Sequence, residues 1–168
     1  DLSTAIKTVP AIIKAKCIPT AIEFMQKEVI SDSESYLGTK FPDSSADAYL
    51  LLKFDGQSVA EIEGYYDGAA KICLERGAKD IFISDTAERD ETIWKARGAF
   101  LEAIKNSTTD MDEVDVVVPR SNVSEMVEFS HKLQEKVGAR IKCFGHAGDG
   151  NLHVYICRDE LTADKWEK

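Results

Sequence analysis

The sequence lacks two features that would each define a class of protein. It has no basic surplus, because 21 Lys+Arg stand against 30 Asp+Glu and give a formal net charge of −9 at pH 7. A protein that neutralises nucleic-acid phosphates needs a clustered basic surface, so this balance argues against such a partner. It also has no long apolar run: the stretch 49–52 is far shorter than the roughly 20 residues of a membrane-spanning helix. We expect neither nucleic-acid binding nor a transmembrane segment.

Cysteine is scarce and scattered. The four cysteines occupy positions 17, 73, 143 and 157, with no Cys-x-x-Cys pair and no repeated spacing. Disulfide frameworks and thiolate zinc sites depend on such pairs, so we expect reduced thiols and a cytoplasmic protein. The N-terminus, Asp1–Thr4, also lacks Met and a signal-peptide pattern, which suggests a piece of a longer chain.

The first 47 residues differ from the rest of the chain. Positions 9–29 have the pattern of a helix in two pieces, interrupted at Pro19. Positions 31–47 carry the Ser and Asp residues that are typical of an irregular surface connection. We expect the segment 1–47 to lie outside a core that occupies 48–168. No internal repeat or low-complexity tract divides the chain further.

Regular elements follow in the core. Short apolar runs predict strands at 49–54, 81–83, 116–118, 141–144 and 152–157. Helices are predicted at 58–77, 87–105 and 123–137. The first of these helices begins at a capping box of Ser58 with Glu61 and ends at Gly77, and the last one ends at Gly138.

This order of elements predicts the fold class. Without the 87–105 helix, it reduces to two β-α-β units and one further strand, which is the arrangement of a ferredoxin-like split βαβ fold. We therefore expect an α+β protein with an antiparallel sheet, helices on one face of it, and the 87–105 helix as an insertion. A doubly wound parallel sheet is the alternative, since strands and helices alternate there too. The last two strands favour the antiparallel fold because no helix separates them.

Arg97 is the first residue that could carry chemistry. It lies on the apolar side of the predicted 87–105 helix, four residues after Ile93 and three before Phe100. A guanidinium in that position needs a partner, and its planar donor fork suits a carboxylate. The alternative is an arginine whose stem packs while its head reaches water.

The segment Gly145–His153 holds two of the chain's three histidines, His146 and His153. The glycines in this segment let the backbone fold back sharply, so the two imidazoles can converge on one divalent metal. Zinc or iron would need at least one further protein ligand. The alternative is a plain hairpin turn with incidental histidines, and Asp149, between two glycines, is typical of a turn.

The nonapeptide GHAGDGNLH at 145–153 resembles a signature in the C-terminal domain of FAD-linked oxidases related to vanillyl-alcohol oxidase. The similar group includes D-lactate dehydrogenase, the glycolate oxidase large subunit and D-2-hydroxyglutarate dehydrogenase. Three further segments support the resemblance: Pro-x-x-x-Glu-Phe-Met at 19–25, Trp-x-x-Arg at 94–97 and Asp-x-x-x-Pro at 115–119. The resemblance covers nearly the whole chain.

The resemblance implies a set of site residues. Arg97 would bind the substrate carboxylate, Asn151 and Tyr155 would also line the substrate pocket, and Asp149 and Asn151 would face the flavin. A divalent metal (zinc, iron or manganese) that polarises the substrate hydroxyl would be held by His146 and His153. FAD would be bound by an N-terminal domain absent from this chain. Electrons would pass to an electron-transfer flavoprotein or an iron–sulfur subunit.

Some positions depart from the family pattern. Glu113 and Tyr155 stand where some relatives have lysine and asparagine, which leaves the substrate open. The family's Glu-His-Gly segment, with a further metal ligand and the expected catalytic base, would lie beyond Lys168. We expect a fragment, inactive alone, of an FAD-dependent oxidoreductase for a small D-2-hydroxy acid such as lactate or glycolate. A non-enzymatic ferredoxin-like module for metal binding or dimerisation is the alternative.

Overall fold

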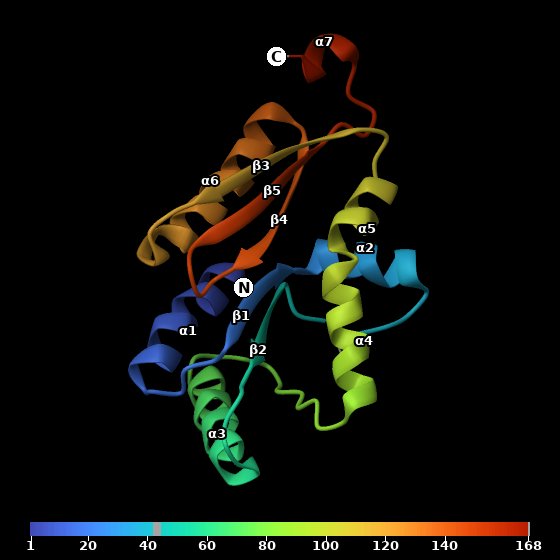
Figure 1. Ribbon diagram of the computed structural model, residues 1–168. Coiled ribbons are helices and arrows are strands. Elements are labelled where there is room, and N and C mark those ends of the chain that lie inside the picture. Colours follow the sequence, from blue (N-terminus) through green and yellow to red (C-terminus); the bar gives the residue numbers. More distant parts are fainter. Residues whose placement is uncertain (42–44, 168) are drawn as a thin grey trace.

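One antiparallel sheet organises the chain. The computed structural model describes residues 1–41 and 45–167, and Figure 1 shows the sheet running diagonally through them. Within these residues, five strands lie in the order β2-β1-β4-β5-β3, with every neighbouring pair antiparallel. The strands are β1 (Ala21–Gln26), β2 (Ala48–Lys53), β3 (Met111–Val117), β4 (Arg140–His146) and β5 (Asn151–Cys157).

Helices surround the sheet, and several begin or end where the sequence predicts. The α-helices in the described residues are α1 (Leu2–Lys14), α2 (Lys27–Leu37), α3 (Val59–Glu75), α4 (Ala87–Gly98), α5 (Phe100–Asn106), α6 (Val123–Val137) and α7 (Ala163–Trp166), and a short 3₁₀ turn, η1, spans Arg120–Asn122. At the start of α3, the Ser58 side chain accepts a hydrogen bond of 3.2 Å from the Glu61 main-chain N–H. Gly138 ends α6 in the left-handed conformation, with φ 72°. The predictions for these two helices are confirmed.

Part of the sheet is a split βαβ unit. Strands β3 and β4 both run antiparallel to β5, which lies between them, so they are parallel to each other. Helix α6 connects β3 to β4. The α+β class with an antiparallel sheet is confirmed. The parallel-sheet alternative is wrong because each neighbouring pair of strands in the sheet is antiparallel.

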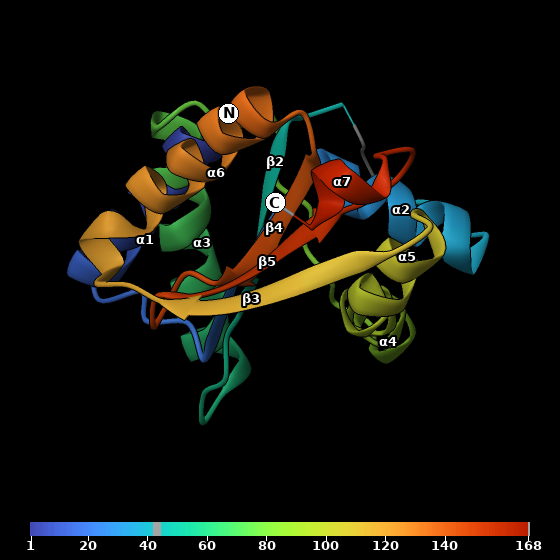
Figure 2. The same cartoon turned by 90° about the horizontal axis from the view of Figure 1, so that it is seen from above.

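Helices cover both faces of the sheet, whereas the ferredoxin-like expectation had them on one face only (Figure 2). Helices α1 and α6 pack on one face in a cluster that includes Phe24 and Leu152. Helices α2 and α5 pack on the other face in a cluster that includes Met25 and Phe144. Successive residues of a strand point to opposite faces, so β1 alone contributes to both clusters. Because both faces of the central strands are apolar, both need a cover.

Strand β1 is the largest departure from the prediction. The helix expected over 9–29 is instead the end of α1, a strand and the start of α2. Strand β1 pairs with β2 on one side and β4 on the other, and Ile22–Gln26 is buried. Several of its residues favour helices, but pairing within the sheet overrides that local preference. The segment 1–47 therefore supplies a central strand of the core, and α2 replaces the first part of the predicted connection 31–47, whose positions 42–44 lie outside the described residues.

Three predictions in the core also change. No strand forms at 81–83, where Phe82 and Ile83 are exposed. The helix predicted at 87–105 divides into α4 and α5 at Ala99. Strand β3 begins at Met111, before the predicted position 116, because the acidic residues of this edge strand hide its apolar pattern. Among the described residues, no helix has the length and apolar character to cross a membrane.

Candidate functional site

The pairing of the strands brings the candidate functional side chains together on the sheet face that α2 and α5 cover. Residues directly opposite each other in antiparallel strands point to the same face. Glu23 lies opposite His146, and His146 lies opposite Asn151. Further along β5, His153 lies opposite Asp115. Together with the arginine that α4 adds, we call this cluster the histidine face: Glu23, Arg97, Asp115, His146, Asn151 and His153.

The hairpin between β4 and β5 sets the spacing of the two histidines. His146 is the last residue of β4, and His153 is the third residue of β5. The turn consists of residues 147–150, and Gly150 has φ 88°, a conformation that favours glycine. A Cβ at Gly150 would lie 2.0 Å from the Val118 carbonyl oxygen, so packing also requires glycine there. The segment is thus a hairpin that also brings its two imidazoles to one face.

Glu23 joins Arg97 to His146. The Oε2 atom of Glu23 accepts hydrogen bonds from Arg97 Nε at 2.9 Å and from Arg97 Nη2 at 2.8 Å. The Oε1 atom lies 2.5 Å from His146 Nδ1. The side chains of Glu23 and Arg97 are only 5% and 15% exposed, so water has little access to their ion pair. Charge-assisted hydrogen bonds are the stronger kind, and this carboxylate therefore holds both partners in place.

Arg97 reaches the sheet from α4. Its Cζ lies 4.7 Å from the centroid of the Phe144 ring and 5.6 Å from that of the Phe100 ring. The predicted inward position of Arg97 on its helix is confirmed, and the guanidinium lies on the same face of the sheet as His146. The alternative of a head group in water is wrong, because the head group pairs with Glu23 and packs on aromatic rings.

The two imidazoles of the histidine face have similar surroundings. Their ring centroids are 5.6 Å apart, with an angle of 80° between the planes. His153 Nδ1 lies 3.3 Å from Asp115 Oδ1, much as His146 Nδ1 lies beside Glu23. In each ring, Nδ1 therefore faces a carboxylate, and the nitrogen that does not is Nε2. Within the residues that the structure describes, no group of three or more His, Cys, Asp or Glu side chains is arranged to hold a metal ion.

Asn151 and Asp149 differ in what their side chains do. The Asn151 Oδ1 atom is buried and has no hydrogen-bond partner in the described part of the chain. A buried acceptor without a partner is costly, so this atom stands out on the histidine face. The Asp149 side chain instead accepts a hydrogen bond of 3.0 Å from the Asn151 main-chain N–H. This is the local bond that makes aspartate common in turns, as the sequence indicated.

Tyr155 and Glu113 lie opposite each other in β5 and β3. The Tyr155 hydroxyl donates a hydrogen bond of 3.0 Å to Glu113 Oε1. Burial and this hydrogen bond raise the pKa of Tyr155, so the hydroxyl keeps its proton at neutral pH. The Tyr155 ring also stacks on Phe144, with 5.5 Å between the centroids. The two positions that depart from the family pattern therefore form one contact.

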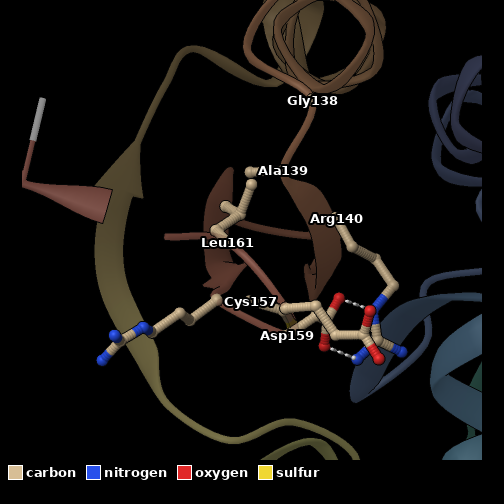
Figure 3. A pocket seen from close by; sticks show the side chains of 8 residues that line it. Gly138, Ala139, Arg140, Cys157, Asp159 and Leu161 are labelled. Atoms are coloured by element: carbon tan, nitrogen blue, oxygen red, sulfur yellow. Dashed lines mark hydrogen bonds and ion pairs between the residues drawn. The ribbon is translucent and has the colours of Figure 1, made fainter. Parts of the chain in front are cut away.

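An open pocket of about 430 Å³ adjoins the histidine face. Its lining includes Glu23, Arg120, His146, Gly148, Asp149 and the segment 18–22. Another pocket, of about 490 Å³, lies at the opposite end of β4 and β5, where Arg140 and Asp159 face each other (Figure 3). Arg140 Nε and Nη2 donate to the two carboxylate oxygens of Asp159 at 2.9 Å and 2.6 Å. This second pocket contains none of the predicted site residues, so we base the functional argument on the first.

The sequence analysis did not single out two carboxylates of the histidine face, Glu23 and Asp115. Glu23 is a charged residue within the otherwise uncharged strand β1. A charge in a buried strand requires a partner, and that requirement is the signal that could have identified it. Asp115 begins the Asp-x-x-x-Pro segment, but β3 carries other acidic residues, and the sequence does not indicate which of them faces a histidine.

Comparisons with known proteins match the whole chain. The sequence profile of a family described as FAD linked oxidases, C-terminal domain, matches residues 1–168. A D-lactate dehydrogenase from Anaerostipes hadrus is 39% identical over 173 residues, which cover 100% of this chain and 36% of that protein. Glycolate oxidase subunit GlcD from Bacillus subtilis (strain 168) is 32% identical over 168 residues, which cover 100% of this chain and 35% of that protein. The chain thus spans about a third of the length of these relatives.

A solved structure shares the fold. An alkyldihydroxyacetonephosphate synthase superposes with a TM-score of 0.64, covering 95% of this chain and 34% of that chain. The sequence identity is 13%, so this similarity concerns the fold alone.

Proposed function

The chain belongs to the C-terminal domain family of FAD linked oxidases, and we propose that it forms the substrate-facing side of a flavoprotein that oxidises a small D-2-hydroxy acid. The observation that carries this proposal is the convergence of Arg97 and His146 on one buried carboxylate. Relatives named D-lactate dehydrogenase and glycolate oxidase support the class of substrate. FAD would be held by another domain of that flavoprotein.

Arg97 would bind the substrate carboxylate. Its Nε and Nη2 atoms bond to Glu23, and Nη1 has no hydrogen-bond partner among the described residues. A guanidinium has five N–H donors in a rigid fork, so the edge with Nη1 can hold a second carboxylate. Asn151, with its unpaired buried oxygen, would accept a hydrogen bond from substrate or flavin, and Tyr155 would close the far side of the site.

The charges on this face favour a monocarboxylate. Glu113 and Asp115 are both acidic, and the Tyr155 hydroxyl already donates its hydrogen bond to Glu113. Lys142, a further cation on the same face, is buried and pairs with Asp32. Near β3, a second carboxylate on the substrate would therefore meet two negative charges and a lysine that is already paired. Lactate or glycolate fits these charges better than a dicarboxylic hydroxy acid.

His146 and His153 are suited to a divalent metal. Histidines that bind metals commonly direct their other ring nitrogen to a carboxylate, and Nδ1 of each ring here faces Glu23 or Asp115. The two Nε2 atoms would then be ligands for zinc, iron or manganese. Further ligands would come from outside the described residues, which contain no cluster of three candidate ligands. A divalent metal bound there would lower the pKa of the substrate hydroxyl.

The remaining parts of the reaction would lie outside the histidine face. FAD, when held by its own domain, would supply the redox chemistry as the acceptor of hydride from the substrate α-carbon. We assign the general base to none of the described residues. Electrons would pass to an electron-transfer flavoprotein or an iron–sulfur subunit. The four free cysteines, all buried, support a cytoplasmic location.

Turnover by the complete flavoprotein tests this proposal. D-lactate, L-lactate, glycolate and D-2-hydroxyglutarate are each supplied with an artificial electron acceptor, and propionate, which lacks the hydroxyl, is the control. We expect turnover with D-lactate or glycolate and none with propionate. A preparation that contains its flavin but oxidises none of the 2-hydroxy acids would refute the proposal.

A further inference from the structure

We propose that Glu23 is a positioning residue, which fixes the edge of Arg97 and the nitrogen of His146 that face the substrate. The role deepens the proposed function and rests on that function for its effect on turnover. The directions of the three hydrogen bonds of Glu23 do not depend on which substrate is oxidised. They follow from the atoms that Glu23 contacts.

Glu23 determines which edge of the Arg97 guanidinium is free. Nε and Nη2 both donate to the same oxygen, Oε2, at 2.9 Å and 2.8 Å. The Phe144 ring lies 4.7 Å from Cζ and restricts rotation of the fork. The edge that contains Nη1 is therefore the one that Glu23 leaves free. Without the Glu23 carboxylate, the fork would lose the contact that sets this orientation.

Glu23 also determines which nitrogen of His146 carries the hydrogen. Its Oε1 atom lies 2.5 Å from Nδ1 of the ring. A carboxylate that pairs with a guanidinium through its other oxygen offers only acceptors, so Nδ1 must be the donor. A neutral imidazole with hydrogen on Nδ1 has its lone pair on Nε2. In the neutral ring, this hydrogen bond therefore directs the Nε2 lone pair to the site.

The surroundings of Glu23 make this selection rigid. Strand β1 lies between β2 and β4, and the Glu23 side chain is 5% exposed, so water does not compete for its oxygens. Arg97 is 74 residues away in the sequence and His146 is 123 residues away. One buried carboxylate thus connects helix α4 and strand β4. The positions of the Arg97 and His146 side chains therefore depend on the same residue.

The substitution Glu23→Gln separates the two effects. Glutamine has nearly the same shape but offers one acceptor oxygen and one NH₂ donor group. Arg97 has only donors, so the glutamine oxygen must remain beside Arg97 and the NH₂ group must face His146. The Nδ1 atom of His146 would then accept, which moves its hydrogen to Nε2. In this variant, Arg97 therefore stays in position, whereas Nδ1 of His146 changes from donor to acceptor.

Nitrogen NMR of the histidine side chains tests the hydrogen-bond direction. Spectra of the complete flavoprotein, treated with a chelator, are recorded near pH 9, well above the ordinary imidazole pKa of about 6.5. A His146→Gln sample assigns the signals. We expect hydrogen on Nδ1 in the wild-type protein and on Nε2 in Glu23→Gln. Wild-type His146 with hydrogen on Nε2 would overturn the proposal, even if the variant failed to fold.

Steady-state kinetics test the consequence for turnover. In Glu23→Gln we expect kcat to fall about 10- to 100-fold, the usual effect of changing the partner of a functional histidine. KM should stay equal or fall, because Arg97 is retained and a negative charge is lost. Glu34→Gln is the matched control, since Glu34 is another buried carboxylate, but its partners are Lys40 at 2.9 Å and the Phe41 main-chain N–H. This control should keep wild-type kcat and KM.

The outcomes are distinguishable. Equal losses in Glu23→Gln and Glu34→Gln, or an unchanged kcat in Glu23→Gln, would show that Glu23 does not position His146 for turnover. If the expected tautomers are found but the wild-type flavoprotein oxidises no 2-hydroxy acid, the proposed function fails and the positioning of His146 by Glu23 stands.

Discussion

The Tyr155 hydroxyl donates a hydrogen bond of 3.0 Å to the Glu113 carboxylate across strands β5 and β3. This contact leaves a negative charge on the sheet face that holds the histidines, and it occupies the hydroxyl that a substrate could otherwise use. Asp115 adds a second negative charge on the same face. Under the proposed function, the pair would bear on the choice between monocarboxylic and dicarboxylic substrates.

Replacing Glu113 by Gln should relax that choice. The substitution removes the charge but keeps an acceptor for the Tyr155 hydroxyl. We expect the ratio of kcat/KM for D-2-hydroxyglutarate to that for D-lactate to rise about tenfold, equivalent to about 1.4 kcal/mol. The kinetics of the complete flavoprotein measure this ratio. An unchanged ratio would show that Glu113 does not face the substrate.

Asp115 provides a test of the metal proposal that leaves both histidines intact. Asp115→Asn changes the carboxylate beside His153 Nδ1. Because such partners orient metal-binding histidines, we expect metal affinity to fall about 10- to 100-fold while the flavin is retained. Metal analysis after dialysis against graded chelator measures the change. Asp112→Asn on the same strand is the control, and equal metal retention in the two variants would separate Asp115 from a metal site.

The sequence predicted the fold class because the signals for it are local. The Ser58 side-chain cap and the left-handed Gly138 concern residues close together in the sequence, and both are found in the structure, although Glu61 returns its hydrogen bond to the Gln57 N–H. Strand β1 could not be predicted in this way. Its residues favour a helix locally, and the chain adopts a strand there only because β2 and β4 lie on its two sides.

The candidate site likewise has a part that local sequence patterns predict and a part that they do not. The nonapeptide indicated His146 and His153, and the apolar side of the helix indicated Arg97. The contacts of Glu23 with Arg97 and His146 became evident only from the tertiary structure, because these partners lie 74 and 123 residues away. Local patterns indicate the candidate residues, whereas the contacts that orient them depend on tertiary structure.

The cysteines should be inert in the native protein. All four are buried, and burial raises the pKa of the Cys143 thiol to about 12. Because the thiolate is the reactive form, we expect no rapid reaction with Ellman's reagent near pH 8 and reaction of all four thiols after denaturation. Mass spectrometry of alkylated peptides identifies which residues react. Rapid labelling of native Cys143 would show that the core around β4 opens readily.

The ion pair between Arg140 and Asp159 should make stability depend on pH. Burial raises the pKa of Asp159, but hydrogen bonds from Arg140 and Thr108 lower it further than burial raises it, so the net shift is downward. A lowered pKa stabilises the fold above the unfolded value of about 3.9, and this stabilisation is lost as the pH falls through the folded value.

Asp159→Asn should therefore destabilise the chain at neutral pH. The two side chains are 36% and 35% exposed, so we expect a loss of at most about 1 kcal/mol in the free energy of unfolding. The difference from the wild-type protein should shrink as the pH falls below about 4. Urea denaturation at several pH values measures it, and a difference that grows in acid would contradict the assignment.

The most direct test of the central claim, that Arg97 holds the substrate carboxylate, is rapid mixing of the oxidised flavoprotein with D-lactate while flavin absorbance is followed. In Arg97→Lys, which keeps the charge but loses the planar fork, we expect the apparent Kd for D-lactate to rise about 10- to 100-fold, as for one or two lost charge-assisted hydrogen bonds. Arg89→Lys is the control, because Arg89 lies on the same helix and pairs with the exposed Asp85. Flavin reduction in Arg97→Lys with the wild-type dependence on D-lactate concentration would contradict the claim.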